Sequence, residues 1–237
     1  IMSPFISMTK GIESKPNSKI DYSINTIGIN FPLKQYGNIS IRTNNEKCKE
    51  NHVSLGNQIF DYNYNSVHID IDQLDNILYP KRGYKITNDY ESNNSYNISK
   101  IKLDYFHTFK FNHTIRLYSL IHQTSINAPN YKNFIYGGYN WLPGYNEFSL
   151  SSSNLSSIGF EYQIHYKNST TFKLLINKIL QYAESNNSLP ISYGVGINIK
   201  SILGPFNFTW ARGLKDPAIS TNVTKHNIFY FNFGVTY

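Results

Sequence analysis

The final eleven residues, 227–237, alternate between two kinds of side chain and indicate more about the fold than any other stretch of the sequence. Because successive side chains of a β-strand point to opposite faces, one face of this segment is aromatic and the other is mostly small or polar. A soluble edge strand with such a face would invite aggregation, whereas a lipid-facing barrel strand requires it. The segment therefore predicts the last strand of a transmembrane β-barrel. Its signal residues are Phe229, Phe231, Phe233, Gly234, Val235 and Tyr237.

The composition agrees with a membrane barrel. The 237 residues include 20 Tyr, 15 Phe and 2 Trp but only 16% charged residues, which suits a barrel with aromatic girdles better than a soluble enzyme. No run of about 18 apolar residues occurs, which excludes a helical membrane span. A net charge of +7 would ordinarily suggest nucleic acid or anionic lipid. The lysines are dispersed, however, and often occupy the polar side of alternating segments, so we expect no nucleic-acid partner.

Alternation with a period of two recurs along the whole chain, and no helical period competes with it. We expect twelve or thirteen strands, each close to the nine to eleven residues of a tilted membrane-spanning strand. Turn-rich segments separate them, and no domain linker is present, so residues 1–237 form one barrel domain. A soluble all-β sandwich would fit the same alternation. The expected strands are Ile1–Met8, Lys19–Phe31, Tyr36–Arg42, Gln58–Asp70, Tyr84–Tyr90, Tyr96–Phe109, Asn112–Gln123, Tyr131–Tyr136, Phe160–Lys167, Thr170–Leu180, Tyr193–Lys200, Phe206–Trp210 and Asn227–Tyr237.

The polar stretch Asn44–Asn51 is interpreted as a loop, and it contains Cys48, the single cysteine. One cysteine allows neither an intramolecular disulfide nor a cysteine metal site.

A first motif lies between two expected strands and has the chemistry of a tight turn. Asp and Asn side chains bond nearby backbone, proline fixes φ, and glycine supplies positive φ. Alternatively, Asp72, Asp75 and Arg82 could form a polar cluster inside a barrel. The order D-x-x-x-N-x-x-x-P-x-R-G resembles a motif of the BamA-type outer-membrane assembly superfamily, where it precedes the ninth of sixteen strands. The motif residues are Asp72, Asp75, Asn76, Pro80, Arg82 and Gly83.

A second motif follows at residues 136–145, where glycines permit tight folding and close backbone approach. Long irregular segments of this kind are often functional. The motif resembles the superfamily loop that folds back into the barrel lumen, but Pro143 stands where assembly factors carry an arginine. The spacing G-G-x-x-x-L-x-G-Y is more similar to barrels fused to patatin-like phospholipases, a type V secretion group. The residues of this expected lumen loop are Gly137, Gly138, Leu142, Gly144 and Tyr145.

The end of the chain resembles the last three strands of the same superfamily, so the resemblance covers residues 58–237 in order. It implies that Gln58–Asp70 is the eighth of sixteen strands and that the chain is the C-terminal part of the barrel. The sequence starts in the middle of a pattern and has no signal peptide, so we expect the natural N-terminus to lie upstream. Earlier strands, periplasmic repeats and any lipase domain would lie there or be encoded elsewhere.

No catalytic signature is found: G-x-S-x-G, a P-loop, a dinucleotide fingerprint and H-E-x-x-H are all missing. The seven histidines are spread over separate segments, and only His107 and His113 flank a common turn. We therefore expect a non-enzymatic chain with no cofactor and no metal.

Three functions stay open at this point. The first is an outer-membrane barrel that anchors or translocates a fused or upstream patatin-like lipase domain. The second is an assembly factor that inserts other barrel proteins, and the third is a soluble all-β binding module. The resemblance implies the lipid bilayer as one partner and the barrel-assembly machinery, through the C-terminal strand, as another. It also implies a bacterial outer membrane, or alternatively that of a mitochondrion or plastid.

Overall fold

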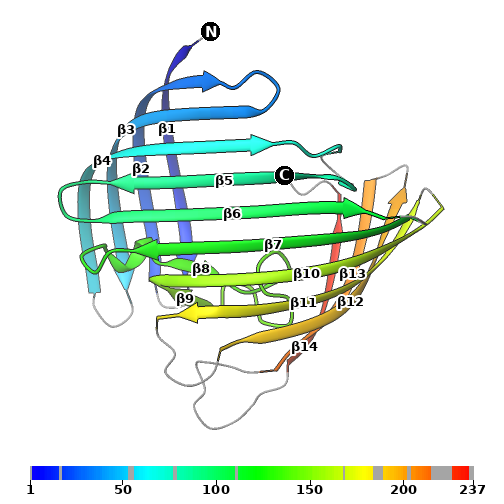
Figure 1. Cartoon of the computed structure of the whole chain (residues 1–237). Coiled ribbons are helices and arrows are strands. Elements are labelled where there is room, and N and C mark those ends of the chain that lie inside the picture. Colours follow the sequence, from blue (N-terminus) through cyan, green and yellow to red (C-terminus); the bar gives the residue numbers. More distant parts are fainter. Residues whose placement is uncertain are drawn as a thin grey trace.

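The structure, a computed structural model, describes residues 2–15, 18–52, 56–76, 79–109, 112–167, 169–183, 189–201, 204–214 and 226–234. Twelve described strands form one antiparallel sheet in which each strand pairs with the next one along the chain (Figure 1). The strands of this sheet are β1 (Ser3–Lys15), β2 (Ser18–Pro32), β3 (Gly37–His52), β4 (Gly56–Asp72), β5 (Gly83–Ser92), β6 (Asn97–Thr108), β7 (His113–Thr124), β10 (Asn154–Tyr166), β11 (Thr170–Tyr182), β12 (Ile191–Ser201), β13 (Gly204–Gly213) and β14 (His226–Phe233).

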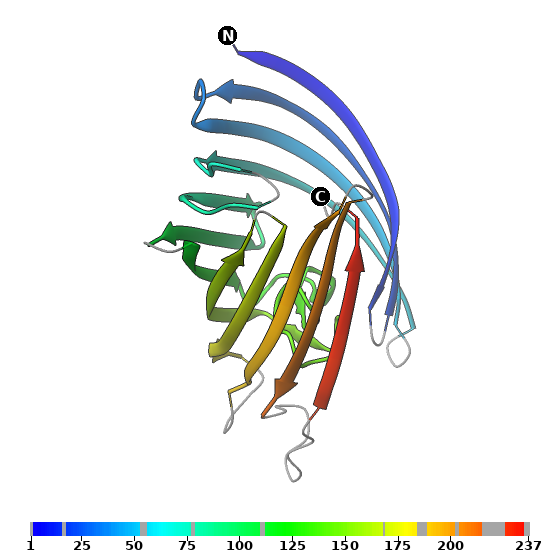
Figure 2. The ribbon, with the colours of Figure 1, turned by 90° about the vertical axis from the view of Figure 1, so that its right-hand side faces the viewer.

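Strand β7 pairs directly with β10, so the segment between them stands outside the sheet. It contains a 3₁₀ turn, η2 (Asn130–Lys132), and the two-stranded ribbon of β8 (Phe134–Tyr136) and β9 (Leu150–Ser152). Figure 2 shows this segment on the concave side of the strongly curved sheet. We call residues 125–153 the inner loop.

The all-β, antiparallel architecture with about twelve strands is confirmed. Among the described strands, β1 and β14 each have a single neighbour, so the sheet is open, as a partial barrel would be. In the part of the chain that the structure describes, no helix is long and apolar enough to cross a membrane.

The period-two pattern explains why these residues form strands with two different faces. In β11, Phe172, Leu174 and Ile176 are exposed on the convex face, whereas Thr171 and Lys173 are buried on the concave face. This distribution is the reverse of that in a soluble sheet, which turns its apolar face inward. Two packed apolar clusters lie among the described residues, one where the inner loop covers the concave face and one where the bent strands do.

Two local predictions were wrong. Asn44–Asn51 is not a loop but part of β3, and Cys48 is only 2% exposed there. The alternation of buried and exposed residues cannot be recognised in this part of the sequence, because Asn45 and Lys47 face outward while the equally polar Glu46 is buried on the concave side. Tyr131–Tyr136 is not one strand; it begins in η2 and ends in the three-residue β8.

Strands β1–β4 are also longer than the predicted nine to eleven residues, at 13 to 17 residues. Strand β4 pairs with β5 only from Asn65 to Asp72, so Gly56–Tyr64 continues beyond the β5–β6 hairpin. Figure 2 shows these four strands as long arcs that curve over the concave side. We call the part of β2–β4 beyond the Thr43–Asn65 pair the distal wall.

Candidate functional site: an apolar outer surface and an inner loop

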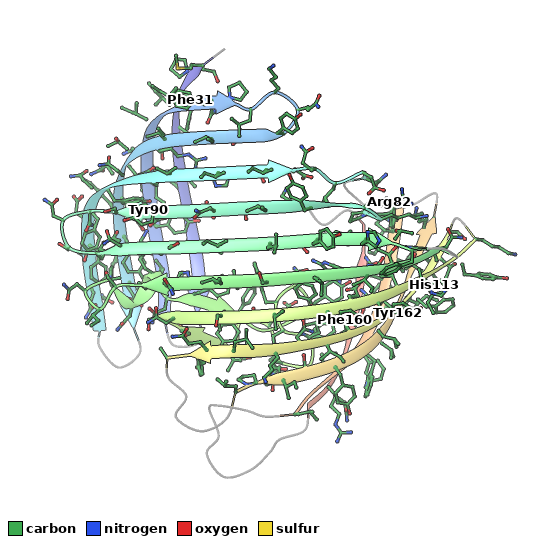
Figure 3. The ribbon with its side chains drawn as sticks, viewed as in Figure 1. Phe31, Arg82, Tyr90, His113, Phe160 and Tyr162 are labelled. Carbon is green, nitrogen blue, oxygen red and sulfur yellow. The ribbon has the colours of Figure 1, made fainter. Side chains whose placement is uncertain are left out.

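Large apolar side chains are exposed on the convex face of the strands around the sheet, except on the Asn65–Asp72 part of β4, where Val67, Ile69 and Ile71 are half-buried. Phe160 is on this face, and Tyr90 and Tyr162 lie toward its two borders (Figure 3). Contiguous exposed apolar patches beyond a few hundred Å² are rare on soluble monomers and indicate contact with a protein or a membrane. Representative members of this outer band are Ile27, Ile41, Leu103, Leu117, Leu174, Val195, Phe208 and Phe231.

Polar and aromatic rows mark the two borders of the band. On the side of the inner loop, register places Thr43 beside Asn65, Asn65 beside Ser92, and Ser92 beside Asn97. On the other side, Tyr84 pairs with Tyr105, and both rings are exposed. From Tyr84 to Ser92 the strand advances by roughly 26 Å at about 3.3 Å per residue. A tilt of about 35–45° reduces this to a height of roughly 20 Å, near the ~25 Å apolar band of outer-membrane barrels.

The turn motif occupies the β4–β5 connection. One oxygen of Asp75 accepts hydrogen bonds from the backbone N–H groups of Lys81 (2.9 Å) and Arg82 (3.1 Å). Partial burial raises the pKa of a carboxyl, but these N–H groups outweigh it, so the pKa of Asp75 lies below its ordinary value. Asn76 accepts a hydrogen bond from the N–H of Tyr79 at 2.9 Å. These contacts are those of a local turn.

Asp72 and Gly83 complete this turn. Asp72 accepts the backbone N–H of Leu74 through one oxygen and the ammonium of Lys85 through the other, at 3.1 and 3.0 Å. Gly83 has φ +105°, and a Cβ there would lie 1.9 Å from the carbonyl oxygen of Gln73. Pro80 is half-buried beside a polar cavity of about 310 Å³ on the concave face. The side chain of Arg82 is exposed, so the structure does not bring Asp72, Asp75 and Arg82 together as one inner cluster.

The tip of the inner loop is formed by residues 137–145. Gly137, Gly138 and Gly144 all have positive φ, and the N–H of Gly138 bonds to the carbonyl oxygen of Tyr145 at 3.0 Å. Leu142 is fully buried in the cluster that the loop makes with β7, β10 and β11. The sequence motif therefore folds as one compact tip on the concave side.

The tip contacts β13 and β14 through backbone as well as side chains. A Cβ on Gly144 would lie 2.6 Å from backbone atoms of Arg212 and Gly213, so the two chains approach as closely as glycine permits. The hydroxyl of Tyr230 accepts the N–H of Gly144 at 3.0 Å and donates to the carbonyl oxygen of Tyr145 at 2.9 Å. Neither Arg212 nor Tyr230 was singled out in the sequence.

Three lysines of the concave face hold aromatic rings of the inner loop. The ammonium of Lys102 lies 4.6 Å from the Trp141 ring centre, and that of Lys100 lies 4.7 Å from the Phe134 ring centre. Lys173 donates to the Tyr139 hydroxyl at 2.7 Å. The tip of the inner loop lacks the arginine of the related motif. The cations of these contacts are instead lysines of the sheet, and their partners are aromatic side chains of the loop. Alternation predicts the inward direction of these lysines but not their partners.

The described part of the terminal strand presents its aromatic face outward. Phe229, Phe231 and Phe233 are exposed, at 80%, 59% and 53%. Phe231 and Phe233 lie against the β13 rings of Phe208 and Phe206, with ring centres 4.9 and 4.6 Å apart. Gly234 follows with φ +94°. Val235 and Tyr237, which belong to the predicted signal, lie outside the described residues.

Arg116 pairs with two carboxylates on the concave face. Arg116 bonds to Asp104 at 2.6 Å and lies 3.7 Å from Glu161. Among the described residues, no group of three or more His, Cys, Asp or Glu side chains is placed to hold a metal ion.

Comparison with known proteins gives a match in structure only. Neither a protein-family model nor a curated protein matches the chain. The crystal structure of BamA from Haemophilus ducreyi lacking POTRA domains 1–3 is similar, with a TM-score of 0.79 and 11% sequence identity over 97% of this chain. The fold is that of a BamA barrel. The chain spans 57% of the length of that solved chain.

The BamA-type architecture predicted from the motifs is thus confirmed as a fold. The predicted strand Gln58–Asp70 lies within β4, and eight sheet strands follow it among the described residues. Its assignment as the eighth of sixteen strands stays a prediction. The specific resemblance to patatin-linked barrels stays a prediction.

Proposed function

We propose that this chain is the membrane-embedded part of an outer-membrane β-barrel whose lumen holds the inner loop. The observation that carries the proposal is the apolar outer band of about bilayer height around a polar concave face. Among the described strands, β1 and β14 each lack a neighbour on one side, and hydrocarbon penalises backbone groups that are left unpaired at such an edge. Further strands therefore complete the barrel in the functional assembly. The bilayer is the primary partner, and the barrel-assembly machinery recognises the C-terminal strand.

We place no catalytic chemistry and no cofactor in this chain. Its role is to anchor or translocate a patatin-like lipase domain that lies upstream or is encoded separately. Support comes from the tip sequence Pro143-Gly144-Tyr145, which has the lipase-linked spacing and no arginine. The contacts of Lys100, Lys102 and Lys173 with the loop give a way to hold that tip without one.

The second candidate is an assembly factor that inserts other barrel proteins into the outer membrane. The similarity of the fold to BamA favours it, as does the open edge of β14, which offers backbone groups to an incoming strand.

Extraction from membranes tests the proposal against the soluble module. The chain, exported to the periplasm of an expression host behind a signal peptide, is expected to remain in the membrane pellet after washing with sodium carbonate and urea. It should be released by detergent, because the outer band needs an apolar solvent. A periplasmic soluble protein processed in parallel is the control. Recovery of folded protein in buffer without detergent would support the binding module instead.

Deletion of the gene in its native host separates the two candidate roles. For a lipase anchor, phospholipase activity of the outer-membrane fraction is expected to fall at least tenfold while other outer-membrane barrels keep their normal folded levels. Activity is measured on fluorescent phospholipids and folding by heat-modifiable migration. Loss of folded barrels with unchanged phospholipase activity would assign the chain to assembly.

A further inference from the structure

The inner loop makes a second attachment at η2, which precedes its tip in the sequence. Its first part, η2, lies under the distal wall. The ammonium of Lys132 is 2.6 Å from a carboxylate oxygen of Glu46 in β3 and 3.2 Å from one of Glu91 in β5. The side chains of Lys132 and Glu46 are only 13% and 5% exposed. One loop cation thus joins two strands that do not pair with each other.

Aromatic and apolar groups enclose this ion cluster. The Lys132 ammonium lies 4.7 Å from the ring centre of Tyr64 in the distal wall. Tyr131 is buried with Ile20 and Cys48, and its ring centre is 5.1 Å from that of Phe60. Tyr64 therefore lies against the Lys132 ammonium, while Ile20, Cys48 and Phe60 cover the adjacent Tyr131.

Charge and burial together favour one position of the Lys132 side chain, between Glu46 and Glu91. Burial lowers the pKa of a lysine, but Glu91 and Glu46 outweigh it and raise the pKa of Lys132 above its ordinary value. The lysine is therefore charged, and withdrawing it would leave a nearly inaccessible Glu46 carboxylate without its cation. Buried ion pairs contribute little net stability but penalise any arrangement in which one partner is removed.

A polar cavity of about 600 Å³ lies behind this cluster. It is bounded by the concave face of β1–β6 and by the inner loop, and its lining includes Arg42, His68, Lys100 and Lys132. The distal wall bends over the same region, so separation of the wall from η2 would open it to solvent on the loop side (Figure 2).

We propose that Lys132, with Glu46 and Glu91, is a latch that positions the base of the inner loop and keeps the distal wall closed over it. The latch acts independently of the tip at Gly144, because it joins the loop to β3 and β5 rather than to β13 and β14. The proposal rests on the proposed function only in taking the concave face as a barrel lumen.

The single cysteine provides a native reporter for this latch. Cys48 is buried against Tyr131, so a water-soluble maleimide reaches its thiol only when the wall leaves η2. For purified full chain in detergent, Lys132→Gln is expected to raise the rate of Cys48 labelling at least tenfold while folded, heat-modifiable migration persists. An unchanged rate in the folded variant would overturn the proposal.

Lys47→Gln is the matched control. Lys47 is adjacent to Cys48 and pairs with Asp61 at 3.7 Å, but both side chains are exposed on the outer face. Removing this charge alters the electrostatic surroundings of the thiol without touching η2, so we expect less than a twofold change in labelling. An equal increase in both variants would show a general charge effect and overturn the proposal.

If Lys132→Gln fails to fold, the test is the charge swap Lys132→Glu with Glu46→Lys, combined with Glu91→Gln so that the new glutamate does not face Glu91. A folded swap variant with slow labelling supports the latch, whereas one that unfolds or labels rapidly contradicts it. Failure of the proposed function would be recognised separately, as release from membranes without detergent, and would leave the labelling result unaffected.

Discussion

Replacement of Gly144 by arginine is expected to abolish the folded, heat-modifiable form of the protein. Gly144 has φ +95°, and a Cβ there would lie 2.6 Å from backbone atoms of Arg212 and Gly213, which cannot swing aside as a side chain can. Backbone strain costs about 1–3 kcal/mol, and overpacking costs about another 1–3 kcal/mol. Their sum is a large part of the roughly 5–15 kcal/mol that separates folded from unfolded domains.

Gly56 supplies the control for this prediction. It also has positive φ, +73°, but nothing lies within 4 Å of the place where its Cβ would be. Gly56→Ala therefore introduces backbone strain without a steric clash, whereas Gly144→Ala introduces both. The folded fraction after refolding into detergent, measured by unheated gel migration, should fall much further for Gly144→Ala. Equal losses at the two positions would mean that the tip does not depend on close contact with β13.

The strands that could be predicted from the sequence are those with one face in an apolar environment and the other in a polar environment. Phe172 and Leu174 alternate with Thr171 and Lys173 because one side of β11 is apolar and the other polar. Two such environments impose a period of two on the side chains of a strand, and that period could be recognised in the sequence.

The β3 part of the distal wall was not predicted as a strand because both of its faces carry polar side chains. The β2 and β4 parts lie largely within the predicted strands Lys19–Phe31 and Gln58–Asp70. Lys47 and Asn45 face water, while Glu46 is buried against Lys132, a residue 86 positions away in the sequence. A buried carboxylate and an exposed one look identical until the distant cation is located. The same limitation applies to Cys48, whose burial comes from the packing of Tyr131.

The inner loop was predicted in part for a related reason. Glycines mark where the backbone must turn, so Gly137, Gly138 and Gly144 pointed to the tip. The residues that hold it, among them Lys102 and Tyr230, lie on strands far apart in sequence and follow only from the curvature of the whole sheet. The sequence therefore located the tip of the loop, whereas the strand residues that contact it could be identified only from the fold.

Substitution of Leu174 by arginine is the second change with a large expected effect. Leu174 is 53% exposed in the middle of the outer band, between Phe172 and Ile176 on the same face of β11. In water, an arginine at so exposed a position changes stability by about 0.5 kcal/mol or less. Facing lipid near the midplane, it costs about 2–4 kcal/mol. The expected result is a loss of that size, measured by urea unfolding in phosphocholine bilayers.

Ile59→Arg is the comparison that separates lipid contact from mere loss of an apolar side chain. Ile59 is 79% exposed, more than Leu174, but it lies on the distal wall, where register places it beside Lys49. The wall stands beyond the polar row of Thr43 and Asn65, so Ile59 faces water and its substitution should change stability little. Similar losses at both positions would extend the lipid-facing surface over the wall. Negligible losses at both would remove the lipid-facing surface itself, because an exposed leucine that tolerates arginine is not in contact with hydrocarbon.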